Sequence, residues 1–174
     1  MTPLLLAVGD NEEQVVALLL DKGADIHADS SILHAARNNT DTGVISLLID
    51  SGVEIHATSS RGQTALHIAA SASEDPRTVE ALLNSGSDVH AKDIDGEIPL
   101  HWAARNNPNN SAVIELLLEH GSDVNARSGI PDRGWTPLQY AARDSGNPKV
   151  IELLLDYGAN ISVSDVLDLS LIHI

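Results

Sequence analysis

The sequence predicts an all-α solenoid, in which stacked antiparallel helix pairs are joined by short turns or β-hairpin fingers. The first observation is a recurring apolar run that ends on a glycine, with 29, 34, 35 and 37 residues between successive glycines. A period of about 33 residues is typical of units that bury their apolar faces only against their neighbours. The second observation is that the 174 residues contain no Phe, two Trp and two Tyr, so Leu, Ile, Val and Ala must build the core. The recurring glycines are Gly23, Gly52, Gly86, Gly121 and Gly158.

We expect a single domain of five repeats, with approximate bounds 1–29, 30–58, 59–92, 93–127 and 128–164. Residues 165–174 align with the start of the fourth repeat, so they predict a partial sixth repeat or a cap. Because the chain starts inside a helix and ends inside a repeat, we expect a fragment of a longer array or the product of a gene cut short. The apolar tail is expected to fold back over the fifth repeat or to pair with another molecule. We hypothesise a monomer with weak self-association through this tail.

Each repeat is predicted to contain a turn, a first helix, a loop and a second helix. In the fourth repeat these helices are Pro99–Arg105 and Val113–Glu119. Thr136-Pro137 marks a helix start, because Thr caps the free N–H groups and Pro suits the first turn. Each second helix ends at a glycine that suits the left-handed cap position. Four second helices follow a good N-cap, whereas the first repeat has the weaker Glu12. The four N-caps are Asp41, Asp75, Asn110 and Asn147.

These motifs resemble those of the ankyrin repeat. Thr136-Pro137-Leu138, Thr64-Ala65-Leu66-His67 and Pro99-Leu100-His101 match its Thr-Pro-Leu-His motif. Gly121-Ser122-Asp123-Val124-Asn125-Ala126 and Gly23-Ala24-Asp25-Ile26-His27-Ala28 match its Gly-Ala-Asp-Val-Asn-Ala ending. The resemblance covers essentially the whole chain and implies helix pairs with projecting hairpin fingers and a concave face that binds proteins. The finger between the first two repeats is nearly absent, and Arg127–Gly134 enlarges the last one.

Composition argues against several functional classes. The net charge of −15 disfavours nucleic-acid binding, which needs Lys- and Arg-rich surfaces. The absence of Cys excludes disulfides and thiolate metal sites. No apolar run is long enough to cross a bilayer, and no signal peptide opens the chain, so we expect no membrane association. The predicted compartment is the cytoplasm, or a host cytosol if the chain belongs to a delivered effector.

The histidines and acidic turns do not predict a catalytic or metal site. His67 and His101 lie at the motif position where the imidazole supports the stack. His27, His56 and His90 recur once per repeat, which places them too far apart to share one ion. Asp93-x-Asp95-Gly96 is turn chemistry, because no Glu closes a calcium loop. We therefore expect no enzyme activity, no cofactor and no metal.

One face of the first helices carries the candidate binding residues. At 100° per residue, Trp102 and Arg105 lie opposite the core residues Leu100, Ala103 and Ala104. An arginine recurs at this position in three repeats, whereas the second helices carry mostly carboxylates. Trp and Arg are enriched at interface hot spots, and we expect Trp135 to be exposed. The candidate partner-binding residues are Arg37, Arg61, Asp95, Glu97, Trp102, Arg105, Arg133, Trp135, Tyr140, Arg143 and Asp144.

Two alternatives remain open for these residues. Trp102 and Tyr140 could pack between repeats, and the arginines could pair locally with Asp95, Asp132 or Asp144. The predicted function is a non-catalytic protein–protein interaction module that binds a partner of acidic or mixed charge through the concave inner-helix face and fingers. The alternative is a targeting or regulatory segment of a larger effector or enzyme whose activity lies outside this chain.

Overall fold

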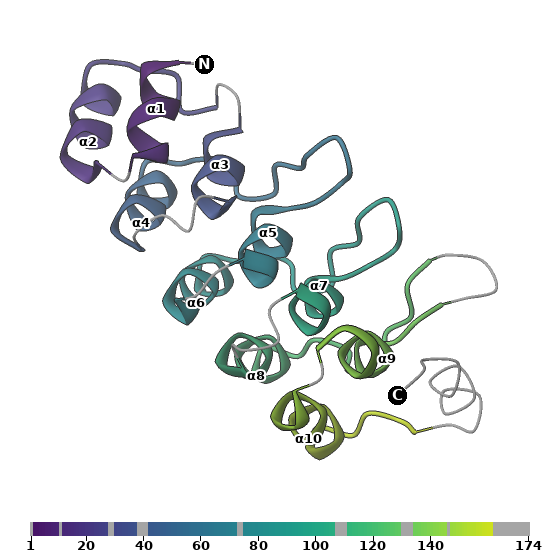
Figure 1. Cartoon of the computed structure of the whole chain (residues 1–174). Coiled ribbons are helices and arrows are strands. Elements are labelled where there is room, and N and C mark those ends of the chain that lie inside the picture. Colours follow the sequence, from purple (N-terminus) through teal and green to yellow (C-terminus); the bar gives the residue numbers. More distant parts are fainter. Residues whose placement is uncertain are drawn as a thin grey trace.

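The computed structural model describes residues 2–10, 12–27, 30–37, 42–72, 75–106, 111–129, 134–145 and 147–161. Over these residues the chain forms two parallel rows of short helices, an inner row and an outer row (Figure 1). The expected all-α solenoid of antiparallel helix pairs is confirmed. The inner helices are α1 (Pro3–Gly9), α3 (Ser31–Arg37), α5 (Ala65–Ala72), α7 (Pro99–Asn106) and α9 (Pro137–Tyr140). The outer helices are α2 (Glu13–Asp21), α4 (Thr42–Asp50), α6 (Pro76–Asn84), α8 (Ser111–Glu119) and α10 (Pro148–Asp156).

The helix starts and ends follow the local signals in the sequence. The side chain of Thr2 accepts a hydrogen bond from the Leu5 backbone N–H at 3.2 Å, as an N-cap does. Asp75 and Asn147 cap α6 and α10 in the same way, each followed by a proline. Glu12 makes no side-chain cap bond, as expected for the weaker residue. Asp41 and Asn110 lie outside the described residues. All five recurring glycines have φ between 84° and 90°, the left-handed conformation that ends each outer helix.

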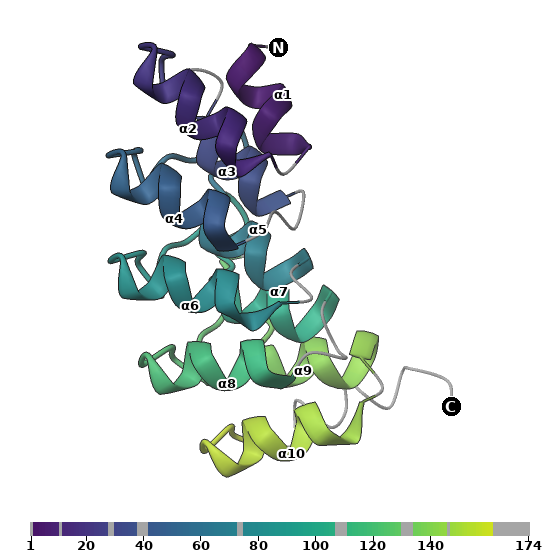
Figure 2. The same ribbon diagram turned by 90° about the vertical axis from the view of Figure 1, so that its left-hand side faces the viewer.

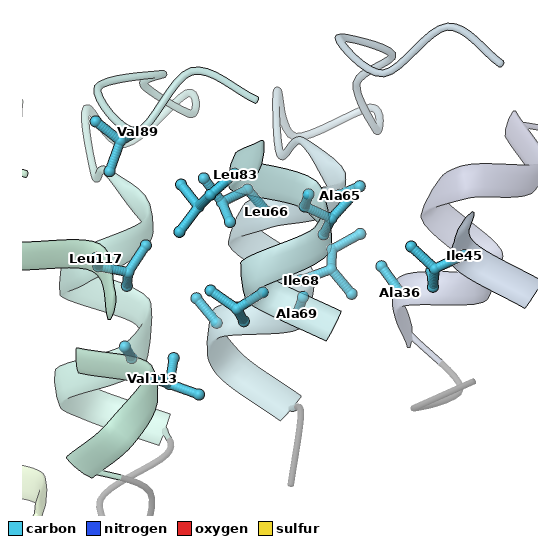
Figure 3. Close-up of a cluster of buried hydrophobic side chains, with 14 of the residues drawn as sticks. Ala36, Ile45, Ala65, Leu66, Ile68, Ala69, Leu83, Val89, Val113 and Leu117 are labelled. Carbon is cyan, nitrogen blue, oxygen red and sulfur yellow. The ribbon is translucent and has the colours of Figure 1, made fainter. Parts of the chain in front are cut away.

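The outer helices stack regularly along the length of the molecule (Figure 2). The leucine-type residue of each inner helix is at most 8% exposed and lies in one continuous core. In the second, third and fourth repeats the alanine pairs three and four positions later, such as Ala69 with Ala70 and Ala103 with Ala104, are fully buried. Figure 3 shows Ala65, Leu66 and Ala69 of α5 among side chains of the neighbouring helices. Small side chains at these positions let successive inner helices pack closely.

Fingers project from the inner row and are joined to one another by backbone hydrogen bonds (Figure 1). The N–H of Ile94 donates to the Arg61 carbonyl at 3.0 Å, and the N–H of Gly129 donates to the Asp95 carbonyl at 2.8 Å. Gly96 has φ of 69°, and a Cβ added there would lie 2.3 Å from the Gly129 nitrogen. The close approach of these two fingers therefore requires glycine at this position.

Some predicted features lie outside the described residues. These are Arg133 and most of the enlarged part of the last finger, and the C-terminal residues 165–174. In the described part of the chain, none of the helices has the length and hydrophobicity that a membrane crossing requires.

The inner helix of the fifth repeat departs from the expected α-helix. After α9 it continues as a π-helical turn, Ala141–Ser145. This widened turn carries Arg143 and Asp144, two of the predicted site residues. Since π-helical turns inside α-helices are uncommon and often occur at functional sites, this part of the inner row is a region of interest.

Candidate functional site

The inner helices carry equivalent residues on the face opposite their leucine and alanine core positions, although two of these residues, Ile68 and Tyr140, are themselves buried. The relevant positions are two and five residues after the buried leucine-type residue of each repeat, so both lie on one helical face. We call these residues the inner-face pairs. From the second repeat to the fifth, the pairs are His34 with Arg37, Ile68 with Ser71, Trp102 with Arg105, and Tyr140 with Arg143.

Asp93 fixes both the finger that contains Asp95 and the ring of Trp102. Its Oδ1 accepts hydrogen bonds from the backbone N–H groups of Asp95 at 2.9 Å and Glu97 at 3.0 Å. Its Oδ2 accepts the indole N–H of Trp102 at 3.0 Å. Asp93 is buried, so this single carboxylate ties the turn of the finger to the inner face. The ring of Trp102 is consequently held in one orientation.

Glu97 joins the fourth and fifth repeats from beneath the surface. Its side chain accepts a hydrogen bond from Arg105 Nη1 at 3.1 Å and one from the Tyr140 hydroxyl at 2.5 Å. Glu97 is 2% exposed and Tyr140 is 5% exposed. Burial, together with the Glu97 carboxylate, raises the pKa of Tyr140 to about 12, so the hydroxyl stays protonated and donates. A buried carboxylate with two charge-assisted partners is satisfied, and it fixes the positions of both partners.

Aromatic and guanidinium groups alternate across the fourth and fifth repeats. The Arg105 guanidinium lies 4.7 Å from the centroid of Trp102 and 5.1 Å from that of Tyr140. The Arg143 guanidinium lies 4.3 Å from the centroid of Trp135 and 5.6 Å from that of Tyr140. These distances are those of cation–π contacts. We call Trp102, Arg105, Trp135, Tyr140 and Arg143 the aromatic–arginine cluster.

Arg143 is also held by its neighbour in the π-helical turn. Its guanidinium makes two 2.7 Å hydrogen bonds to Asp144, and these bonds raise its pKa above the usual value. The pair is exposed, so it contributes little to stability. Its effect is to orient Arg143 over the ring of Trp135.

A cleft of about 270 Å³ opens on the same face at the third repeat. Arg37 and Trp102 lie at its two sides, and Ile68, Ser71 and Ala72 of α5 lie between them. Gln63 and His67 complete the lining. We call this hollow the third-repeat cleft. No carboxylate is among the described residues that line it.

The structure distinguishes surface residues from supporting residues among the predicted set. Arg61 and Asp95 form an exposed ion pair at 2.8 Å between adjacent fingers. Trp102 is half-buried, and Arg143 and Asp144 are exposed. Tyr140 and Glu97 are buried and support the surface from below. Arg61 and Arg143 therefore pair locally with Asp95 and Asp144, which is one of the two alternatives that the sequence left open.

Trp135 is half-buried, so the expectation that it is exposed was wrong. Its ring packs against the core and lies 5.4 Å from the ring of Tyr140. Its backbone is fixed as well, because its N–H donates to Ser128 Oγ at 3.0 Å. Arg37 is exposed, and it forms no ion pair with any described carboxylate.

The two motif histidines support the stack, as predicted. The backbone N–H groups of Thr64 and Ile98 donate to Nδ1 of His67 and His101, so Nε2 carries the proton in each ring. His67 Nε2 donates to the Glu97 carbonyl at 3.0 Å, and His101 Nε2 donates to the Ala126 and Trp135 carbonyls at 3.1 Å. Burial lowers the pKa of His67 and lowers that of His101 to about 4. Both rings are therefore neutral structural links between repeats.

Sequence reasoning missed two features of this surface. Asp93 was assigned to a turn, which is correct, but its bond to Trp102 joins residues of a finger and a helix and has no local signal. The third-repeat cleft has a signal in the sequence, because Ile68 and Ser71 are smaller than the residues at the matching positions of the fourth and fifth repeats. Among the described residues, no three His, Asp or Glu side chains gather closely enough to hold a metal ion.

Comparison with known proteins agrees with this geometry. A family model described as ankyrin repeats (3 copies) matches residues 32–128 and 70–165, and a model of the single ankyrin repeat matches residues 1–31. A search of curated proteins finds no match. The matched residues cover most of the chain, and they include all the inner-face pairs and the cleft. The chain therefore belongs to the ankyrin repeat family.

Proposed function

We propose that this chain is a non-catalytic module that binds a partner protein through the inner-helix face and the fingers. Ankyrin repeats are generally protein–protein interaction modules, and domains built from them typically have no catalytic activity. The observation that carries the proposal is the aromatic–arginine cluster. Trp, Tyr and Arg are the residue types in which binding energy concentrates at interfaces.

The cluster is preorganised as well as chemically suited. Asp93 holds the ring of Trp102, and Glu97 holds Arg105 and Tyr140, so these side chains lose little conformational freedom when a partner binds. Side chains that are already fixed lower the entropic cost of association. The half-buried rings of Trp102 and Trp135 and the exposed Arg143 offer surface that is both apolar and cationic.

The charge distribution supports a partner of acidic or mixed charge. The net charge of the chain is −15, and the outer helices carry Glu80, Glu115, Glu119, Glu152 and Asp156. The inner helices and fingers instead expose Arg37, Arg61 and Arg143, of which Arg61 and Arg143 are each paired with a carboxylate. Oppositely charged surfaces speed association and suppress wrong partners, so the inner face should select acidic surfaces.

Site-specific photo-crosslinking tests the proposal. A photoreactive amino acid replaces either Asn106, at the end of α7 on the inner side, or Glu115 on the outer helix α8 of the same repeat. Both positions are exposed, so each variant should fold normally. After irradiation in native lysate, mass spectrometry should identify a protein adduct from position 106 and none from position 115. Adducts from position 115 alone would contradict binding through the inner face.

A further inference from the structure

The third-repeat cleft exists because one repeat breaks the pattern of the inner-face pairs. The fourth and fifth repeats place an aromatic ring and an arginine at these positions, and the second repeat places His34 and Arg37 there. The third repeat has Ile68 and Ser71 at the same positions. The smaller side chains of the third repeat leave the cleft of about 270 Å³. Its two sides are Arg37 of the preceding repeat and the ring of Trp102 of the following repeat.

The cleft combines one cation with an apolar floor. Ile68 is 8% exposed, and Ala72 and the ring of Trp102 continue the apolar surface on either side. Arg37 supplies the positive charge. Within the described residues it forms no ion pair, whereas Arg61, Arg105 and Arg143 each have a carboxylate partner. A guanidinium without a carboxylate partner, in a cleft whose described lining holds no carboxylate, is notable in a chain of net charge −15.

We propose that the third-repeat cleft binds a short segment of a partner protein in which an Asp or Glu lies beside a compact apolar side chain. The carboxylate pairs with Arg37, with the Ser71 hydroxyl within the same cleft, and the apolar side chain covers Ile68 and Ala72 against the ring of Trp102. This inference rests on the proposed function and assigns the anchoring contact to the third repeat. The aromatic–arginine cluster then forms one wall of the site.

A small free anion fits this site less well than a peptide. One exposed guanidinium gains little from an ion pair in water, because solvent screens it and the side chain loses freedom. Useful affinity must therefore come from apolar contacts made beside the charge. A peptide segment with a carboxylate beside an apolar side chain can pair with Arg37 and cover the apolar floor at the same time. The required spacing between these two side chains provides specificity.

Selection from a random-peptide phage library on the full chain tests the inference. We expect the enriched sequences to share an Asp or Glu within two residues of Leu, Ile, Val or Met. The most enriched peptide is then synthesised with a fluorophore, and its affinity is measured by fluorescence anisotropy. Arg37→Gln should weaken its binding by about threefold to fivefold, because an exposed ion pair is lost. Ser71→Arg should abolish measurable binding by filling the cleft, whereas Ser71→Ala should leave the affinity within about twofold.

Charge variants at the rim give a second, independent measurement. Ala72 is exposed at the end of α5, so it accepts substitution without disturbing the core. Ala72→Glu and Ala72→Lys both lengthen the side chain at the rim, so Ala72→Glu should weaken binding of the acidic peptide clearly more than Ala72→Lys does, because only the sign of the charge differs. Arg77→Gln on the outer helix α6 is the matched control and should change nothing. Urea unfolding of each variant shows that it is folded.

The outcomes separate this inference from the proposed function. An unchanged affinity in Arg37→Gln and Ala72→Glu, or a selection without the acidic–apolar pattern, overturns the cleft assignment. If photo-crosslinking from position 106 still captures a partner in that case, binding through the inner face stands. If adducts form only from position 115 and the selected peptide is insensitive to Ser71→Arg, both proposals fail.

Discussion

The third repeat and the fourth repeat use the same backbone framework to build opposite surfaces. In the fourth repeat, Glu97 lies before the inner helix and binds Arg105 and Tyr140, so the surface is closed and cross-linked. In the third repeat, Gln63 occupies the matching position, and the inner face above it is an open cleft. The helix, its histidine support and its alanine pair are alike in both repeats. The inner-face pair and the residue before the helix differ between the two repeats, and these positions decide whether the face is closed or open.

The two halves of the face therefore have different roles. The closed half holds large side chains in fixed positions, which favours a rigid wall for a partner. The open half is the third-repeat cleft, which has a small apolar floor and one cation, Arg37, that forms no ion pair with a described carboxylate. This combination favours insertion of a side chain from the partner. A long binding surface is thereby divided into a wall and a pocket without any change in the fold.

Removal of Glu97 should be the most disruptive change to this arrangement. Glu97→Ala deletes the shared acceptor of Arg105 and Tyr140 and leaves a mostly buried guanidinium unpaired, so we expect a loss of about 3 kcal/mol in the free energy of unfolding. The matched control is Gln63→Ala, which removes a neutral, buried side chain bonded to Ser59 at 3.3 Å. Its cost should be about 1 kcal/mol or less. Urea unfolding followed by tryptophan fluorescence measures both, and equal losses would mean that Glu97 does not organise the closed half.

Acid should destabilise the links on both sides of the cleft. The pKa of His101 is about 4 in the folded chain and near 6.5 when unfolded, so the unfolded chain binds the extra proton between these values. Stability is complete above pH 6.5 and falls as the pH drops toward 4, by on the order of 2 to 3 kcal/mol from this group. The lowered pKa of His67 adds a loss of the same sign.

The fifth repeat offers a natural substitute for these histidines. Gln139 occupies the matching position there, and its Oε1 accepts the Thr136 backbone N–H at 2.8 Å. His101→Gln should therefore keep the helix cap and flatten the loss of stability between pH 6.5 and 4, even if its stability at neutral pH is lower. His120→Gln, at an exposed position, is the control and should leave the slope unchanged. The same slope in His101→Gln and the parent chain would rule out this origin of acid sensitivity.

Local signals in the sequence were sufficient for the fold. Asp75, Thr136 and Asn147 cap helices as predicted because a cap involves neighbours within three residues. The glycine ends and the buried alanine pairs follow from the period of the helix and of the repeat. The shared side of Trp102 and Arg105 was predictable for the same reason.

The contacts within the site depend on stacking between repeats, which the sequence does not specify. Glu97 and Tyr140 are 43 positions apart, and their hydrogen bond requires the exact offset of one repeat on the next. The half-burial of Trp135 has the same origin, because it results from the position of Tyr140 and Arg143 over its ring. The π-helical turn at Ala141–Ser145 has no sequence signal that we can identify.

The two cluster arginines should differ although they occupy the same position in successive repeats. Arg105 pairs with the buried Glu97, whereas Arg143 pairs with the exposed Asp144. Arg105→Ala should cost about 2 kcal/mol of unfolding free energy, because it leaves a buried carboxylate with only the Tyr140 bond. Arg143→Ala should cost less than about 1 kcal/mol. Thermal or urea unfolding measures the difference, and similar costs would show that both arginines act as ordinary surface residues.

The smallest effect on stability is expected from converting the open half into a closed one. Ser71→Arg introduces the residue that the second, fourth and fifth repeats carry at this position. Arg105 stacks on the ring of the next repeat at 5.1 Å, so the introduced guanidinium should stack on Trp102 in the same way. The gain is expected to be about 0.5 kcal/mol or less for a partly exposed cation–π contact. Urea unfolding should show an unchanged or slightly higher midpoint, and the fluorescence of Trp102 should change, whereas Ser71→Ala should alter neither. A clear destabilisation by Ser71→Arg would mean that the third repeat is packed too closely to accept the pattern of its neighbours, and that the cleft is not simply the volume of a missing side chain.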